Sequence, residues 1–138
     1  MANTIPIKTP AELEILRKAG RILSSILKEV SGSVRAGMTT RDIDLLTEQL
    51  IAARGCQAAF KGYRGYPASA CVSVNEQIVH GIPSAGKVIQ DGDIVSVDAG
   101  LIYNGYYADM AVTVPVGNVD PEVMRLLEVT RESLLKGI

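Results

Sequence analysis

The amino-acid sequence predicts a single α+β domain over residues 1–138, with helices covering an antiparallel sheet. Two stretches before residue 56 carry apolar side chains at every third or fourth position, which is the period of an amphipathic helix. Short apolar runs rich in β-branched residues follow between residues 70 and 115, as is typical of strands. The dipeptide Asn104-Gly105 joins two of these runs and favours a tight hairpin, so the strands it connects are antiparallel.

Three helices are expected, and each has a recognisable start. The first begins at Thr9-Pro10-Ala11-Glu12, where a capping hydroxyl, a proline and a glutamate suit the free amide groups of a helix start, and it runs to about Val30. The second begins at Thr39 or Thr40 and ends at Gly55. The third begins at Asp120-Pro121, and we expect its inner side to hold Val123, Leu126, Leu127, Thr130 and Leu134.

Two hairpins are expected after the second helix. Residues 70–74 and 77–80 are short apolar runs separated by Asn75-Glu76, a pair typical of a turn. Residues 94–103 and 106–115 flank Asn104-Gly105 and form the second hairpin. Two helices that cover one face of such a sheet leave its other face, or an edge, in need of cover.

The second hairpin brings two acidic residues together. A two-residue turn at Asn104-Gly105 pairs Tyr103 with Tyr106 and thereby sets every later pair. Because side chains on one face recur at every second residue, Asp98 and Asp109 share a face as diagonal neighbours, about 7–8 Å apart at Cα. Their carboxylates could therefore converge on one cation.

The pair of aspartates has a metal interpretation and a plainer one. Asp is uncommon in strands, and two buried carboxylates among Val, Ile, Ala and Tyr would be costly without a proton or a metal ion. A hard divalent cation removes that cost. Alternatively, Asp98 and Asp109 both face solvent, one of them pairs with a nearby Lys or Arg, or a bulge turns one to the other face.

Three other features have both structural and functional interpretations. His80 is followed by Gly81-Ile82-Pro83, a rigid exit that would hold the imidazole in one direction, yet a lone His is commonly structural. The segment Tyr63–Pro67 has the composition of a pocket wall and of ordinary packing. Cys71 suits a small buried residue better than a nucleophile, because His80 is the only His that could activate it.

Composition excludes several classes of protein. The net charge of −1, from 14 Lys and Arg against 15 Asp and Glu, provides no general attraction for nucleic acid or anionic lipid. One His and two Cys cannot build a zinc site of four Cys, of two Cys with two His, or of three His within one chain. The start lacks a secretion signal, and no run approaches the roughly 20 apolar residues that span a bilayer. We therefore expect a cytoplasmic protein without nucleic-acid or membrane partners.

Four motifs together resemble the type I methionine aminopeptidases of bacteria. They are Tyr63–Pro67, Cys71–Glu76 with His80–Pro83, Gly92–Asp98, and Tyr106–Asp109, and they occur in that family's order and spacing. The resemblance covers essentially the whole chain and implies half of a pita-bread fold, in which two pseudo-symmetric halves enclose a dinuclear metal site. It also implies removal of N-terminal Met from nascent proteins by divalent-metal-assisted peptide hydrolysis.

The resemblance assigns roles position by position. Asp98 resembles the carboxylate that chelates one metal, and Asp109 the carboxylate that bridges both. His80 resembles the catalytic His that hydrogen-bonds the substrate near the scissile amide. Tyr63, Tyr66 and Cys71 resemble walls of the pocket that accepts the Met side chain. The implied cofactor is a divalent metal, Mn, Fe, Co or Zn, with two ions in a complete site.

The sequence departs from that family in length and at one motif. Family members are about twice as long, and their other ligands, a His and two Glu, lie in the half that would follow Ile138. Two carboxylates fall short of the roughly four to six donors of a typical site, so weak or absent metal occupancy is expected here. The segment Tyr107-Ala108-Asp109-Met110 replaces a more usual His-Gly-Asp-Thr pattern, which would change the surroundings of Asp109.

Three functional interpretations follow. In the first, the chain is the N-terminal half of a methionine aminopeptidase, inactive as a monomer, which binds an N-terminal Met peptide together with a complementing C-terminal half or in a homodimer. In the second, it is a non-catalytic peptide-binding or dimerising module. The third is a proline-specific or creatinase-type pita-bread hydrolase, which Cys71 and Tyr63–Pro67 disfavour because they resemble the methionine-specific branch.

Overall fold

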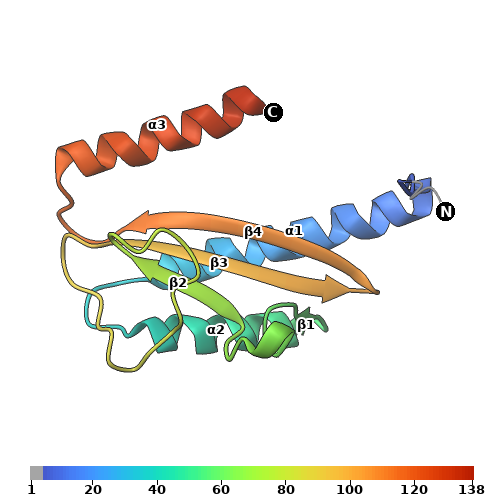
Figure 1. Cartoon of the computed structure of the whole chain (residues 1–138), viewed down its shortest axis with the longest axis horizontal. Helices are drawn as coiled ribbons and strands as arrows, with labels where there is room; N and C mark the ends of the chain where they lie inside the picture. Colours follow the sequence, from blue (N-terminus) through green and yellow to red (C-terminus); the bar gives the residue numbers. More distant parts are fainter. Residues whose placement is uncertain (1–4) are drawn as a thin grey trace.

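The first two helices lie where the sequence predicts them. A computed structural model describes residues 5–138, with α1 at Pro10–Ser33 and α2 at Thr40–Ala53 (Figure 1). Each helix starts with a capping box, in which the side chain of Thr9 or Thr39 accepts a hydrogen bond from the third helical amide and the acidic side chain at that position accepts one in return. Both predicted helix starts are confirmed.

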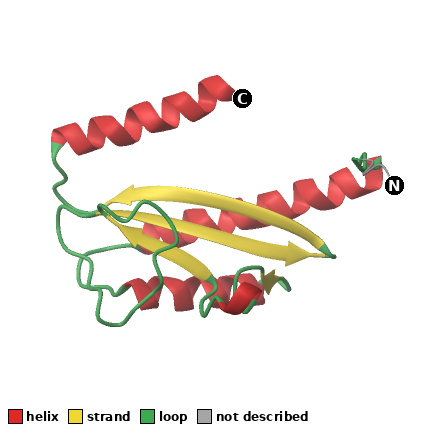
Figure 2. Cartoon of the chain, viewed as in Figure 1, coloured by secondary structure: helices red, strands yellow, loops and turns green. Residues whose placement is uncertain are grey.

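The sheet is antiparallel and has four strands, β1 at Gln57–Ala58, β2 at Ala70–Val74, β3 at Ile94–Tyr103 and β4 at Tyr106–Pro115 (Figure 2). The long strand β3 pairs with β1 and β2 on one side and with β4 on the other. Strand β4 is therefore an edge strand whose outer backbone groups pair with no other strand in the part of the chain that the structure describes. The very short strand β1 was not predicted from the sequence.

The predicted register of the second hairpin is confirmed. Tyr103 pairs with Tyr106, and the two turn residues Asn104 and Gly105 both have positive φ, 48° and 81°, as a type I′ turn requires. Asp98 lies opposite Ala111 and Asp109 lies opposite Gly100. No bulge interrupts the pairing, so both aspartates occupy the same face of the sheet.

The predicted first hairpin is wrong in its second strand. β2 pairs with β3, whereas residues 77–80 form no strand. The side chains of Ile78 and Val79 are 88% and 62% exposed, so the apolar residues that predicted a strand are not packed. The backbone at His80 has φ of 59°, a left-handed conformation outside the strand region, and the chain then returns toward β2 at Gly81.

The hydrophobic core lies between the two leading helices and one face of the sheet. Helix α1 packs on β3 and β4, and α2 packs on β2 and β1. Alternate side chains of β3 and the inner side of α1 are fully buried in this layer, among them Leu23, Ile26, Val95, Val97 and Leu101. The opposite face of β3 and β4 carries Asp98 and Asp109 and is left free of these two helices.

Helix α3, Pro121–Gly137, begins at the predicted residue but does not bury the predicted side. Asp120 caps it, as expected, and the Asp120 carboxylate accepts a hydrogen bond from the Glu122 amide at 2.8 Å. No residue of α3 is buried, and Leu126 and Leu134 are 58% and 65% exposed. The helix stands away from the sheet in Figure 1, and on its predicted inner side only Val123 and Leu127 are half-buried within the described chain.

None of the helices in the described residues is both long enough and apolar enough to cross a membrane.

Candidate functional site

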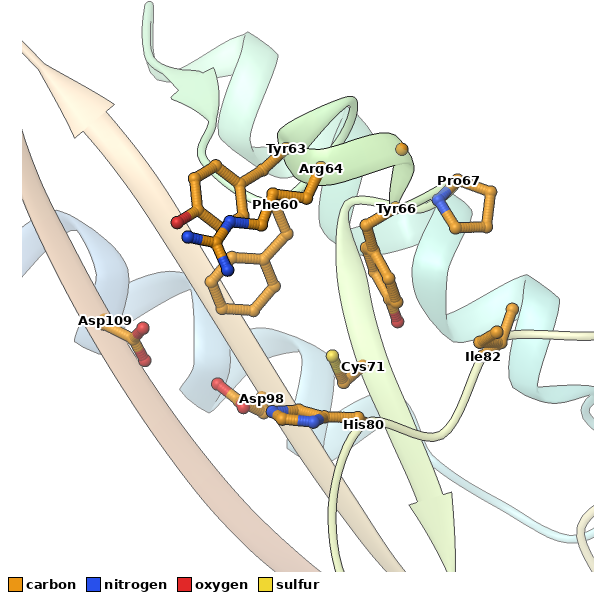
Figure 3. Close-up of a pocket in the computed structure, with 11 residues that line it drawn as sticks. Phe60, Tyr63, Arg64, Tyr66, Pro67, Cys71, His80, Ile82, Asp98 and Asp109 are labelled. Atoms are coloured by element: carbon orange, nitrogen blue, oxygen red, sulfur yellow. The ribbon is translucent and has the colours of Figure 1, made fainter.

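A pocket opens on the free face of the sheet and contains every residue singled out from the sequence. Its volume is about 610 Å³, and it lies between the loop of residues 60–67, the start of β2, the segment 80–82 and the strands β3 and β4 (Figure 3). The predicted residues that line it are Tyr63, Tyr66, Cys71, His80, Asp98 and Asp109. The fold therefore brings together six residues that the sequence separates by up to 46 positions, from 63 to 109. Their individual roles remain predictions.

The two aspartates differ in their surroundings. Asp98 sits on the central strand β3, between Cys71 of β2 and Ala111 of β4, and is half-buried. Asp109 sits on the edge strand β4 and is exposed. Figure 3 shows the Asp98 carboxylate beside the His80 ring, with Asp109 on the neighbouring strand. A cation held by both carboxylates would thus contact the sheet on one side, and its other side would be exposed to solvent.

The Asp98 carboxylate lacks a partner that its burial requires. Burial raises its pKa, the negative charge of Asp109 raises it further, and His80 opposes this by lowering it. Its Oδ1 atom is buried and has no hydrogen-bond partner among the described residues. A buried carboxylate oxygen without a partner costs free energy, and a proton or a hard divalent cation relieves that cost. The donor set therefore fits the carboxylate part of a divalent-metal site.

The described residues supply only part of such a site. No group of three or more His, Cys, Asp or Glu side chains in residues 5–138 is arranged to hold a metal ion. A typical divalent site has about four to six donors, so Asp98 and Asp109 would need further ligands from water or from polypeptide outside the described residues.

His80 is held in place by its neighbour Gly81. The Gly81 amide donates to Ser73 Oγ at 3.0 Å, and its carbonyl accepts from the Val72 amide at 2.9 Å. A Cβ at position 81 would lie 2.4 Å from the Val72 carbonyl oxygen, so only glycine permits this approach. The φ of His80 is positive, and its exposed imidazole lies near Asp98, whose pKa it lowers (Figure 3). The backbone directly after His80 is thus anchored by these two hydrogen bonds, and a fixed direction of the imidazole stays a prediction.

Tyr66 and Cys71 line the pocket near the start of β2. The Tyr66 hydroxyl donates to the carbonyl oxygens of Ala70 at 3.1 Å and Gly81 at 3.4 Å, and burial raises the pKa of its phenol. Cys71 is 5% exposed, and burial raises the pKa of its thiol, so the thiol stays protonated near neutral pH. A protonated thiol is a poor nucleophile, and the interpretation of Cys71 as a small buried wall residue is favoured over a Cys-His enzyme.

Tyr63 occupies the rim of the pocket, because 64% of its surface is exposed. The guanidinium of Arg64 lies over its ring, 5.5 Å from the ring centre. Tyr63 therefore contributes to the mouth of the pocket more than to its wall.

Some residues of the site were missed in the sequence. Phe60 packs over Gly100, where an added Cβ would lie 2.7 Å from its Cε1 atom. A glycine inside a strand is a sign of such close approach, so Gly100 could have indicated it. The buried Asp44 of α2 accepts hydrogen bonds from the amides of Ser69 and Ala70 at 2.8 and 2.9 Å and so fixes the start of β2.

Comparison with known proteins identifies the family. Residues 14–138, nearly the whole chain, match the sequence profile described as metallopeptidase family M24. The chain belongs to this family. Because M24 proteins are metallopeptidases, the match agrees with the carboxylate pair as part of a divalent-metal site.

Several methionine aminopeptidases are similar to this chain over nearly all of its length. Methionine aminopeptidase 1 of Bacillus subtilis is 48% identical over 131 residues, which cover 95% of this chain and 52% of that protein. The crystal structure of methionine aminopeptidase from Thermotoga maritima superposes with a TM-score of 0.94 at 46% identity, over 98% of this chain and 54% of that one. The chain spans about half the length of the curated relatives it matches.

More distant M24 structures share the same architecture. The Xaa-Pro dipeptidase from Bacillus anthracis superposes with a TM-score of 0.82 at 25% identity, over 96% of this chain and 36% of that one. The predicted α+β class and half of a pita-bread fold are confirmed by these superpositions. The higher identity to methionine aminopeptidases agrees with the resemblance found in the sequence.

Proposed function

We propose that this M24 chain carries one half of a methionine aminopeptidase site, which binds the N-terminal Met of a peptide and takes part in hydrolysis of the following peptide bond. The observation that supports this best is the position of Asp98, whose buried Oδ1 lacks a partner among the described residues, beside Asp109 and His80 at one pocket. Carboxylates for a cation, a fixed imidazole and an apolar recess are the parts that such a reaction requires. We also propose that the protein works in the cytoplasm, where nascent chains are made.

The pocket would hold the Met side chain at the end lined by Tyr66 and Cys71. Tyr66 supplies an aromatic ring and Cys71 a protonated thiol, and Phe60 packs against Gly100 of the sheet. An unbranched thioether fits such a recess, because it bends easily and makes favourable contacts with aromatic rings. The protonated state of Tyr66 and Cys71 keeps this end of the pocket free of charge.

Asp98 and Asp109 would hold the divalent metal, which is Mn, Fe, Co or Zn. When bound, such ions polarise a carbonyl oxygen and make a water molecule more acidic. In the absence of the metal, the two negative charges at one side of the pocket would attract the free amino group of the peptide toward the sheet. His80, held by Gly81, would hydrogen-bond the substrate beside the scissile amide and keep that bond in one orientation.

We propose that polypeptide outside the described residues completes the site. The two carboxylates are fewer than the usual donors, strand β4 presents an open edge within the described residues, and a groove between β4 and α3 is lined by Ala111, Thr113, Leu127, Thr130 and Leu134. The M24 relatives have about twice the length of this chain, so in them another part of the polypeptide is available for this role. A second copy of this chain and a complementing C-terminal half are the two sources, and the monomer alone is then inactive.

Release of Met from a Met-Ala-Ser peptide, with Mn²⁺ or Co²⁺ added, tests this proposal. We expect activity only in assemblies larger than the monomer, its loss with a chelator, and its loss in Asp98→Ala, while Glu76→Gln at an exposed turn position has no effect. Sedimentation equilibrium of the same samples identifies the assembly, because a second copy gives twice the mass of the chain. Met release by a monomer of residues 1–138 would refute the need for further polypeptide.

The second candidate function is a non-catalytic peptide-binding module. It is favoured by the absence of a group of three or more metal-ligating side chains within the described residues. Peptide binding that is unchanged by chelator and by Asp98→Ala, without Met release in any assembly, would support this candidate over the enzyme.

A further inference from the structure

We propose that Arg64 forms a carboxylate-binding subsite at the rim of the pocket, which makes the chain prefer peptides that carry a negative charge beyond their N-terminal residues. This inference rests on the proposed peptide-binding function. Arg64 is the one permanently charged cation among the described residues that line the pocket. The ligand class is a carboxylate, from an acidic side chain or from the C-terminus of a short peptide.

The backbone around Arg64 presents its side chain at the rim. Gly62, Arg64 and Gly65 all have positive φ, of 85°, 49° and 82°, so the chain makes a tight left-handed loop here. The Gly62 amide donates to the Tyr66 carbonyl at 2.8 Å and closes this loop. A left-handed conformation is unfavourable for a residue with a side chain, so the loop holds Arg64 where an unconstrained chain would seldom place it.

The guanidinium is supported but not neutralised. Tyr63 provides a ring beneath it, at 5.5 Å from the ring centre, and this contact leaves the N–H groups free for a ligand. No ion pair in residues 5–138 includes Arg64, although two carboxylates line the same pocket. Figure 3 shows Arg64 with Tyr63 on the opposite side of the pocket from Asp98. Arg64 is therefore a cation without a partner among the described residues.

The order of charges matches the polarity of a bound peptide. In the chain without metal, Asp98 and Asp109 on the sheet attract the positive amino terminus, and Arg64 at the exposed rim attracts a negative group farther along the peptide. A peptide bound in the reverse direction would meet the wrong charge at both ends. The two carboxylates therefore favour entry of the peptide by its N-terminus, and Arg64 favours an acidic residue farther along the peptide.

Binding of three peptides to the full chain tests the subsite. The probes are Met-Ala-Glu-amide, Met-Ala-Gln-amide, and Met-Ala-Gln with a free C-terminal carboxylate, each titrated by calorimetry at low salt. We expect the Glu-amide peptide to bind about threefold more tightly than the Gln-amide peptide, as exposed ion pairs allow. The third peptide shows whether a C-terminal carboxylate serves equally well. Screening in about 0.5 M NaCl should remove the preference.

Substitutions of Arg64 test whether its positive charge or the geometry of its guanidinium group causes the preference for acidic peptides. In Arg64→Gln the Glu and Gln peptides should bind equally, whereas Arg64→Lys should keep part of the preference because the charge remains. Arg41→Gln, an exposed position on α2 outside the pocket, should keep all of it. Equal binding of the peptides to the unmodified chain, or a preference that survives Arg64→Gln, would overturn the subsite alone. Failure of all three peptides to bind would also overturn the subsite, and Met release from Met-Ala-Ser by a larger assembly would then show that the proposed function still holds.

Discussion

Replacement of the buried Asp44 should destabilise the protein more than replacement of any exposed acidic residue. Its Oδ1 atom accepts hydrogen bonds from the amides of Ser69 and Ala70 at 2.8 and 2.9 Å, and its side chain is 6% exposed. A hydrogen bond to a charged group contributes about 1.5–3 kcal/mol. Asp44→Ala removes two of these bonds and leaves two buried amides unpaired, so the expected loss is about 3–6 kcal/mol. That loss approaches the whole stability of a typical domain.

Urea unfolding followed by circular dichroism measures this effect. Since the slope of such transitions is about 1–3 kcal/mol per M of urea, the midpoint for Asp44→Ala should fall by at least about 1 M. Asp44→Asn retains an oxygen acceptor without the charge and should lose less. Asp42→Ala is the matched control on the same helix, because its bonds to Thr39 lie in solvent. A midpoint for Asp44→Ala equal to that of Asp42→Ala would refute the reasoning.

Three further predictions concern the backbone, the first helix and the metal. Gly81→Ala should lower the free energy of unfolding by about 1–3 kcal/mol in the same urea assay, because its Cβ would lie 2.4 Å from the Val72 carbonyl oxygen. Gly86→Ala is the control and should be tolerated, because the nearest atom to its Cβ would lie at 3.6 Å. The Thr9 backbone hydrogen bond lowers the pKa of Glu12 from 4.5 to about 2, so the advantage of the unmodified chain over Glu12→Gln should be full above pH 4.5 and vanish as the pH falls toward 2. Thermal midpoints of both proteins at several pH values show this, and a difference independent of pH would contradict it. Mn²⁺ in large excess over its weak dissociation constant should raise the thermal midpoint of the unmodified chain but not of Asp98→Asn, and an equal rise in both would mean that the ion binds elsewhere.

The pairing of the second hairpin was predictable from residues that are close together in the sequence. Asn104-Gly105 tolerates positive φ at two successive positions, and this alone sets the pairing of β3 with β4. The shared face of Asp98 and Asp109 follows from that pairing, so this part of the site was predictable without any knowledge of the tertiary structure.

The segment after β2 shows where such local rules fail. Residues 77–80 form a short, partly β-branched run that includes Ile78 and Val79, but β2 pairs with β3 instead of with them. The contact that replaces the hairpin depends on Gly81 reaching Val72 and Ser73. Which segment pairs with a given strand depends on partners that are distant in the sequence, and a periodic pattern carries no information about them.

Helix α3 also combines one feature that the local sequence determines with one that it does not. Its start is local, because the carboxylate of Asp120 caps the amide of Glu122. Its packing is not local, because the apolar residues at 126 and 134 remain exposed within the described chain. Periodicity shows which side of a helix is apolar, but only neighbouring elements determine whether that side is covered.

The helix starts, the turn type and the strand register could therefore be predicted from the sequence, because each depends on contacts within a few positions of the chain. The pocket could not be predicted in this way, because it is formed by segments that lie far apart in the sequence and meet only when the helices pack on the sheet. The unpaired oxygen of Asp98, the buried anchor Asp44 and the position of the Arg64 guanidinium all depend on that packing of the described residues. Burial and missing partners are properties of the assembled core, and they give these side chains their chemistry.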